Sequence, residues 1–139
     1  MKNSYFAFIL MFILGSCNQT ITQKDLEKIN GYWEIEKVVL ADGSKKEYVV
    51  NEAIDYFELK ANKGFRKKVV PQLDGTYLIN NQSENIEIFK DKESFYILYN
   101  TKYTKFREQI VELRDSVLVL KTKQNVFYHY KKPIPFSVK

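Results

Sequence analysis

Short runs of β-branched and aromatic residues, separated by turn signals, recur along most of the chain. Such runs predict strands, because these side chains pack well on a half-buried pleated surface. The expected strands are residues 32–40, 54–60, 65–70, 76–79, 86–89, 94–100, 106–113, 117–122 and 126–131. Turn signals lie between them at residues 42–43, 62–64, 74–75 and the polar stretch 80–83. The pattern predicts a single all-β domain of about eight strands.

The connections between these strands are too short to hold crossover helices. Sequential strands are therefore expected to pair antiparallel, as an up-and-down meander. A meander has two unpaired edges, and closing it into a barrel removes both. A two-layered sandwich is the alternative. One segment is ambiguous, because Phe106, Ile110 and Leu113 also have helical spacing; the alternation of Val111 and Leu113 with charged residues favours a strand.

A short helix is expected before the first strand. Thr22 and Asp25 have the spacing of a helix start, Leu26 and Ile29 share one face, and Asn30 with the following glycine ends the helix. The tail at residues 133–135 contains two prolines and cannot continue a central strand.

The N-terminus carries the pattern of an export signal. Lys2 precedes the uninterrupted apolar run 5–14, which is too short to span a bilayer. The following Leu14-Gly15-Ser16-Cys17 resembles the lipobox of bacterial lipoproteins, and Cys17 is the only cysteine. The resemblance implies a signal peptide at 1–16, lipidation of Cys17, a tether at 17–22 and a barrel domain at 23–139. The alternatives are a weak membrane anchor and an ordinary signal peptide that is followed by a cysteine by chance.

Lipidation would attach the protein to a membrane, since more than one acyl chain anchors stably. Asn18 follows the cysteine, and no acidic residue lies there to signal retention at an inner membrane. The expected location is the outer membrane of the cell envelope, with the leaflet left open. Because no other cysteine exists, the domain depends on core packing rather than on a disulfide.

Composition adds an excess of aromatic residues and of positive charge. Tyr and Phe occur ten times each, and the formal net charge is +5. Arg66, Lys67 and Lys68 form a basic run that could contact anionic headgroups, although a solvated strand face or hairpin rim is the simpler explanation. Nucleic acid is not expected as a partner of an exported lipoprotein, and a monomer is expected.

Nothing in the sequence indicates an enzyme. His129 is the only histidine and has no nucleophile or acid at a motif spacing. With one histidine and one cysteine, no metal site is predicted, and no glycine loop for a phosphate cofactor is present. No cofactor is expected. The triplet Asp115-Ser116-Val117 resembles an O-glycosylation motif of Bacteroidetes, which makes Ser116 a candidate modification site.

Gly31-Tyr32-Trp33, at the start of the first strand and just after the short helix, resembles the Gly-x-Trp signature of lipocalins. More narrowly, the chain is similar to small lipocalin-like lipoproteins of Bacteroidetes. The resemblance implies a barrel of about eight strands in which Gly31 and Trp33 close one end. The chain departs from the family in three ways. Lysines 131 and 132 stand where an arginine usually follows the last strand, and the disulfide and the C-terminal helix are missing.

Two strands are apolar on both faces, which favours a ligand cavity. By alternation, one inward face would comprise Phe95, Ile97 and Tyr99 and the other Val126, Tyr128 and Tyr130. Tyrosines suit an apolar cavity with a few polar groups, whereas a filled core is the alternative. The first hypothesis is a lipoprotein that binds or carries a small apolar or amphipathic ligand, such as a fatty acid. The alternative is a structural lipoprotein with a solid core that docks on an envelope complex.

Overall fold

The computed structural model describes residues 20–134 of the chain. The predicted signal peptide and the lipobox with Cys17 lie outside these residues, as do residues 135–139. The described part contains one short 3₁₀ helix, η1 (Gln23–Ile29), and nine strands. The strands are β1 (Gly31–Val39), β2 (Lys45–Glu47), β3 (Ile54–Lys60), β4 (Lys63–Pro71), β5 (Tyr77–Asp91), β6 (Ser94–Asn100), β7 (Lys105–Leu113), β8 (Val117–Thr122) and β9 (Phe127–Lys131).

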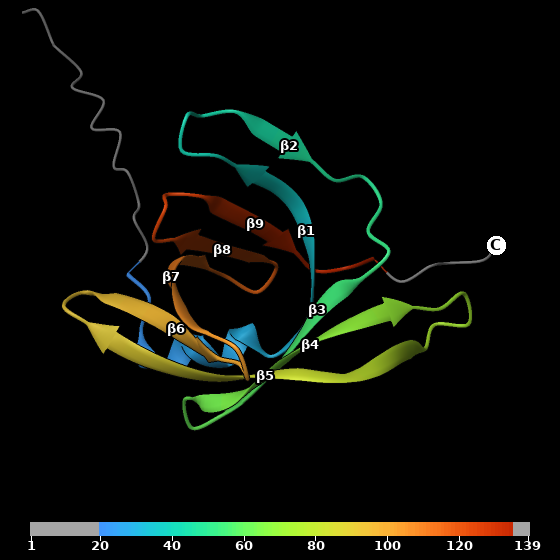
Figure 1. Ribbon diagram of the computed structural model, residues 1–139, viewed down its shortest axis with the longest axis horizontal. Coiled ribbons are helices and arrows are strands. Elements are labelled where there is room, and N and C mark those ends of the chain that lie inside the picture. Colours follow the sequence, from blue (N-terminus) through green and yellow to red (C-terminus); the bar gives the residue numbers. More distant parts are fainter. Residues whose placement is uncertain (1–19, 135–139) are drawn as a thin grey trace, which may run out of the picture.

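All nine strands belong to one antiparallel sheet, in the order β2-β1-β3-β4-β5-β6-β7-β8-β9. The last strand also pairs with β1, so the sheet closes on itself (Figure 1). Only β2 stands outside the ring, and eight strands form a barrel. This confirms the predicted closed meander and excludes the sandwich. Residues 106–113 are a strand, as the alternation indicated.

The strands differ from the expected ones in two ways. The predicted turn at residues 80–83 lies inside β5, which runs without interruption through both expected strands. Instead of a turn, this segment contains a bulge, in which β5 has more residues than the facing part of β4. Lys67 pairs with Ser83, whereas Val69, two residues later, pairs with Ile79. The short strand β2 was not predicted. The pairing of β1 with β3 ends at Trp33, and the second half of β1 pairs with Lys45–Glu47 instead.

The short helix begins and ends as the sequence predicts. The backbone N–H of Thr22 and its Oγ1 both donate to Asp25 Oδ2, at 2.8 and 2.7 Å. Buried Leu26 and Ile29 pack against the core of the barrel, so η1 covers one end of it. We call this end the closed end. The opposite end, where β6 turns into β7 and β8 turns into β9, is the open end. None of the helices in residues 20–134 is long and apolar enough to cross a membrane.

Candidate functional site

The inside of the barrel divides into a filled half and a hollow half. Near the closed end, apolar side chains from almost every strand meet beneath η1 and are nearly or fully buried. They include Trp33, Phe57, Ile86, Ile88, Phe95, Ile97, Ile110, Leu113, Leu118 and Leu120. Interiors packed in this way hold no space for a ligand. Any ligand site inside the barrel must therefore lie toward the open end.

Trp33 lies at the closed end and is fully buried. Its Nε1 donates to the carbonyl oxygen of Ile29 in η1, at 2.8 Å. Lys132 Nζ stands 3.8 Å from the centre of the indole ring and donates to the Asn30 carbonyl. Lys132 thus covers one face of the buried indole ring. Gly31 has a φ of +110°, and a Cβ there would lie 3.3 Å from Lys132 Nζ.

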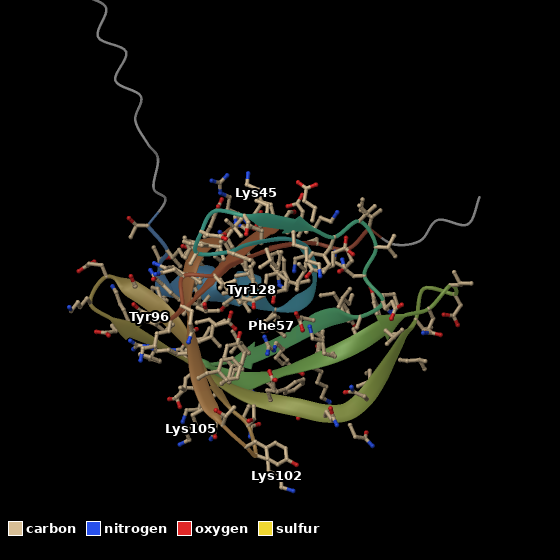
Figure 2. All side chains as sticks on the ribbon, turned by 45° about the horizontal axis from the view of Figure 1, so that its top comes forward. Lys45, Phe57, Tyr96, Lys102, Lys105 and Tyr128 are labelled. Carbon is tan, nitrogen blue, oxygen red and sulfur yellow. The ribbon has the colours of Figure 1, made fainter. Side chains whose placement is uncertain are left out.

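The open half contains a cavity of about 770 Å³. Aromatic and aliphatic groups form part of its wall, and charged or polar groups form the rest. Its lining comprises Ile35, Arg66, Lys68, Leu98, Lys105, Phe106, Arg107, Glu108, Thr122, Lys123, Gln124, Tyr128 and Tyr130. Figure 2 shows Tyr128 within the ring of strands, with Lys102 and Lys105 at its periphery. A cavity of this size and composition is typical of a small-molecule site.

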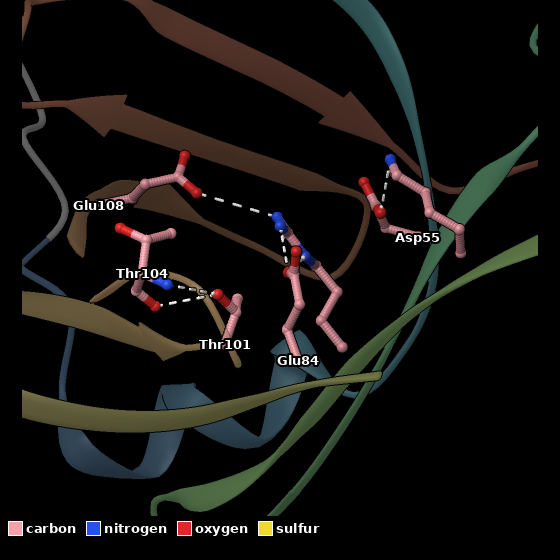
Figure 3. Close-up of polar contacts among 7 residues, drawn as sticks. Asp55, Glu84, Thr101, Thr104 and Glu108 are labelled. Atoms are coloured by element: carbon pink, nitrogen blue, oxygen red, sulfur yellow. Dashed lines mark hydrogen bonds and ion pairs between the residues drawn. The ribbon is translucent and has the colours of Figure 1, made fainter. Parts of the chain in front are cut away.

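Arg66 projects from β4 into the barrel and separates the two halves. Its Nε donates to Glu84 Oε2 at 2.7 Å, and its Nη2 pairs with the same oxygen (Figure 3). The guanidinium also lies over the Tyr99 ring, 4.3 Å from its centre. Tyr99 in turn stacks on Phe106, with the ring centres 4.6 Å apart. These contacts hold the guanidinium in one orientation at the base of the cavity.

Two further acids stand inside the barrel. Glu108 is 6% exposed, and its Oε1 lies 3.9 Å from Arg66 Nη1. Burial raises the pKa of the Glu108 carboxyl, against the opposing effect of Arg66. Asp55 is 1% exposed, and its Oδ1 lies 2.7 Å from Lys68 Nζ. The base of the cavity is thus a network of opposite charges rather than an apolar floor.

Two buried tyrosines belong to the same network. Burial raises the pKa of both Tyr99 and Tyr130 well above the ordinary value, the neighbouring Glu108 raises both further, and Asp55 also raises that of Tyr130. Both phenols therefore stay protonated and can donate hydrogen bonds. The Tyr99 hydroxyl lies beside the Glu108 carboxylate, and each of the two groups affects the pKa of the other.

The six residues proposed for the cavity fall in three places. Tyr128 and Tyr130 line the cavity. Phe95, Ile97 and Tyr99 also point inward, but they belong to the packed core. Val126 lies before β9, where its N–H donates to Thr122 Oγ1 at the turn.

The basic run on β4 is divided between the two faces of the strand. Arg66 and Lys68 face inward, with ion-pair partners inside the barrel. Lys67 faces outward, where its Nζ lies 4.8 Å from the centre of the Phe65 ring. The three side chains therefore do not form one surface cluster.

Sequence reasoning missed the buried acids Asp55 and Glu108, and also the half-buried Glu84 that pairs with Arg66. A charged residue in a strand is usually taken to face solvent. The alternation of side chains along the strand does indicate that Glu108 points inward, because Glu108 shares a face with Phe106 and Ile110.

Two other candidate residues lie outside the cavity. Ser116 is exposed in the turn between β7 and β8, and its modification stays a prediction. His129 lies on β9, paired with Lys37 and Val119 on the neighbouring strands. Within residues 20–134, no cluster of three or more His, Cys, Asp and Glu side chains could hold a metal ion.

Comparison with known proteins gives structural neighbours alone. The sequence matches no protein-family model and no curated protein. One similar solved structure is a lipocalin-like protein from Bacteroides uniformis, 15% identical, with a TM-score of 0.49 over 76% of this chain and 99% of that chain. Another is an uncharacterized protein from Bacteroides eggerthii, 12% identical, with a TM-score of 0.48 over 75% of this chain and 98% of that chain.

Proposed function

We propose that the protein is a non-enzymatic, membrane-anchored, lipocalin-like lipoprotein that binds a small amphipathic molecule in the open half of its barrel. The observation that carries the proposal is the cavity of about 770 Å³ between the charged network at Arg66 and the loops of the open end. Its aromatic walls provide apolar contact, and its charged base provides hydrogen bonds.

The energetics set the expected strength of binding. Covering about 300 Å² of apolar ligand surface contributes roughly 7 kcal/mol at about 25 cal/mol per Å². The loss of translational and rotational freedom on association consumes much of this. Affinities in the micromolar range are therefore the expected ceiling, unless the polar base of the cavity adds specific contacts.

Native mass spectrometry of the protein as purified, followed by titration with a fluorescent fatty acid, tests the proposal. We expect a co-purified small molecule or saturable binding of the probe. Tyr128→Trp adds a larger ring to the cavity wall and should weaken binding. Tyr96→Trp is the matched control, because Tyr96 lies on the outer face of β6, stacked on Phe89. A folded protein with no bound molecule and no saturable binding would contradict the proposal.

The membrane anchor is proposed from the lipobox. Lipidation of Cys17 would hold the closed end near the bilayer, since Ile21 packs against the core and lies four residues after Cys17. Four residues span at most about 14 Å. We propose an outer-membrane location on the same basis. Radiolabelled palmitate should enter the wild type and fail to enter Cys17→Ser, and equal labelling of the two would exclude lipidation at this residue.

A second candidate function is favoured by exposed aliphatic side chains. Val49 is 93% exposed, and Leu73 at the tip of the β4–β5 hairpin is 79% exposed. Together with neighbouring apolar residues they resemble the surfaces through which proteins dock on partners. This is the interaction lipoprotein of the alternative hypothesis. It becomes the preferred function if the cavity binds nothing.

A further inference from the structure

The charged side chains that line the cavity are mostly positive. Glu108 is the acid in the lining, and the cations are Arg66, Lys68, Lys105, Arg107 and Lys123. A cleft lined mainly by one sign of charge concentrates ligands of the opposite sign. Some of these cations pair with acids that lie outside the lining. The place where an anion would bind therefore depends on which cations have no such partner.

The two cations at the base of the cavity are compensated by acids inside the barrel. Arg66 directs Nε and Nη2 at Glu84, and its Nη1 lies 3.9 Å from Glu108 Oε1. Lys68 Nζ lies 2.7 Å from Asp55 Oδ1 (Figure 3). Two cations thus stand among three acids. The carboxylates would repel a negatively charged ligand group placed here, so the base of the cavity is not a site for an anion.

Arg107 is directed toward the outer face of the barrel. Its guanidinium lies 4.7 Å from the centre of the Tyr96 ring, and its Nη1 lies 3.9 Å from Asp91 Oδ2. Both side chains of this ion pair are about half exposed, where such a pair contributes little to stability. Arg107 therefore adds positive charge near the open end, but its side-chain contacts lie on the outer face.

Lys105 and Lys123 are the cations of the lining that have no acidic partner among the described residues. Lys105 is the first residue of β7, and Lys123 lies in the turn between β8 and β9. Pairing of β7 with β8 ends at Glu108 and Thr122, so both lysines lie just beyond the last pair, at the mouth of the cavity (Figure 2). Both are exposed, and neither takes part in an ion pair within residues 20–134.

The apolar part of the lining includes aromatic surface that the protein leaves uncovered. Phe106 stacks on Tyr99, with the ring centres 4.6 Å apart, yet Phe106 is still 38% exposed. Tyr128 on β9 lines the same cavity and is half-buried. An apolar group that covers these rings is stabilised, because it removes apolar area from water. The cavity thus combines an apolar wall with two uncompensated cations at its mouth.

We infer that the ligand of the cavity is an organic anion whose negatively charged group binds Lys105 and Lys123 at the mouth, with its apolar body inside against Phe106 and Tyr128. This rests on the proposed ligand-binding function and names the charge of the ligand and its orientation. A carboxylate, a sulfonate and a phosphate share the required chemistry. In this orientation the charged network at Arg66 stays undisturbed, and the packed half beneath η1 limits the depth of the site.

Isothermal titration of the full-length protein in phosphatidylcholine nanodiscs tests the charge of the ligand, with empty nanodiscs as the blank. Two matched series of probes each have one apolar body and three head groups. The first is naphthoate, naphthalenemethanol and naphthylmethylammonium, and the second is octanoate, octanol and octylammonium. In a series that binds, the acid should bind about tenfold more tightly than the alcohol, and the ammonium more weakly than either.

The outcomes separate the inference from the proposed function. An alcohol or an ammonium that binds as tightly as the corresponding acid would overturn the inference and leave the proposed function standing. No binding in either series, with no co-purified molecule, would overturn both.

The dependence of affinity on salt tests the same claim without a variant. Raising the ionic strength from about 0.01 M to about 1 M shortens the Debye length from about 30 Å to about 3 Å. Because both lysines are exposed, the affinity for the acid should fall toward that for the alcohol, which should not fall. An affinity for the acid that is independent of salt would contradict binding at these lysines.

Variants locate the negatively charged group. Lys105→Gln combined with Lys123→Gln should weaken binding of the acid about tenfold and leave binding of the alcohol unchanged. Lys45→Gln combined with Lys46→Gln is the matched control, because it removes the same charge from exposed positions on β2, outside the ring of strands. Its affinity for the acid should equal that of the wild type. Equal losses in the two double variants, or no loss in the first, would overturn the assigned site.

Discussion

Trp33 is held at the closed end of the barrel by contacts of three kinds. Its ring is fully buried in the core, its Nε1 donates to Ile29 and Lys132 stands over its face. A single aromatic residue thus connects η1, β1 and the segment after β9. Its removal is expected to affect the whole domain rather than one element.

Trp33→Ala should lower the free energy of unfolding by about 3–5 kcal/mol, because a large buried ring leaves a cavity behind. Urea denaturation measures the change. Tyr103→Ala is the control, since Tyr103 is 88% exposed in the β6–β7 turn and should change stability by no more than about 0.5 kcal/mol. An unchanged midpoint for Trp33→Ala would show that Trp33 does not close the barrel.

Glu108 should make stability depend on pH. Burial raises its pKa above the unfolded value, so the folded state holds the proton more tightly than the unfolded chain does. The stability that the folded state gains by binding this proton is fully present below the pKa of Glu108 in the unfolded chain. It is lost as pH rises through the pKa of Glu108 in the folded state. The free energy of unfolding of the wild type, relative to Glu108→Gln, should therefore fall as pH rises above the ordinary glutamate pKa of about 4.3, and it should level off above the raised pKa of folded Glu108.

Urea melts of the wild type and Glu108→Gln across this range give the difference directly. Taking the difference removes the contributions of the other acids. A relative stability that rises with pH would mean that Glu108 is stabilised as a carboxylate, and that its pairing with Arg66 outweighs its burial.

At the scale of elements, the β3–β4 hairpin shows how turn geometry fixes a register. Lys60 pairs with Lys63, so the turn has two residues, Ala61 and Asn62, both with positive φ. These angles match the two-residue turns whose twist suits a hairpin. Asparagine tolerates this conformation well, whereas alanine is strained in it.

Ala61→Gly should therefore raise the free energy of unfolding by about 0.5–1 kcal/mol, because relief of the strained φ exceeds the entropy that glycine loses on folding. Thermal denaturation would show a higher midpoint. A lower midpoint would mean that the alanine methyl makes stabilising contacts that outweigh its strain.

The strands also differ in how well the sequence predicts them. The strands at 54–60, 94–100 and 117–122 were predicted with the bounds that the structure has, because apolar side chains mark at least one face of each. β2 has no apolar residue and exists through its pairing with β1, which no local pattern shows. Likewise, residues 80–83 are polar enough for a turn, yet β5 continues through them because it pairs with β4 on both sides, at Ile79 and at Ser83.

The candidate site was less predictable than the fold. Tyr128 and Tyr130 were placed in the cavity by alternation, which needs local sequence alone. The acids Asp55, Glu84 and Glu108 were missed, because the burial of Asp55 and Glu108 and the pairing of Glu84 depend on residues far away in the sequence. Glu84 is 18 residues from Arg66, and the pair forms through the β4–β5 register.

For the whole molecule, closure of the sheet decides where function can reside. Pairing of β1 with β9 joins the two ends of the described chain and removes the barrel's free edges. The interior so enclosed is filled beneath η1 and hollow beyond Arg66. The hollow half faces away from the N-terminal segment, so an anchor at Cys17 would leave the open end turned away from the bilayer.

The central claim is that a small molecule binds in the open half of the barrel and leaves the closed half unchanged. Amide NMR spectra of ¹⁵N-labelled protein, recorded during titration with the best-binding probe, test this claim most directly. We predict saturable shifts at Glu108, Thr122 and Tyr128, with small changes at Phe57 and Leu118. Shifts confined to the closed end or to the outer face of the barrel would contradict the account.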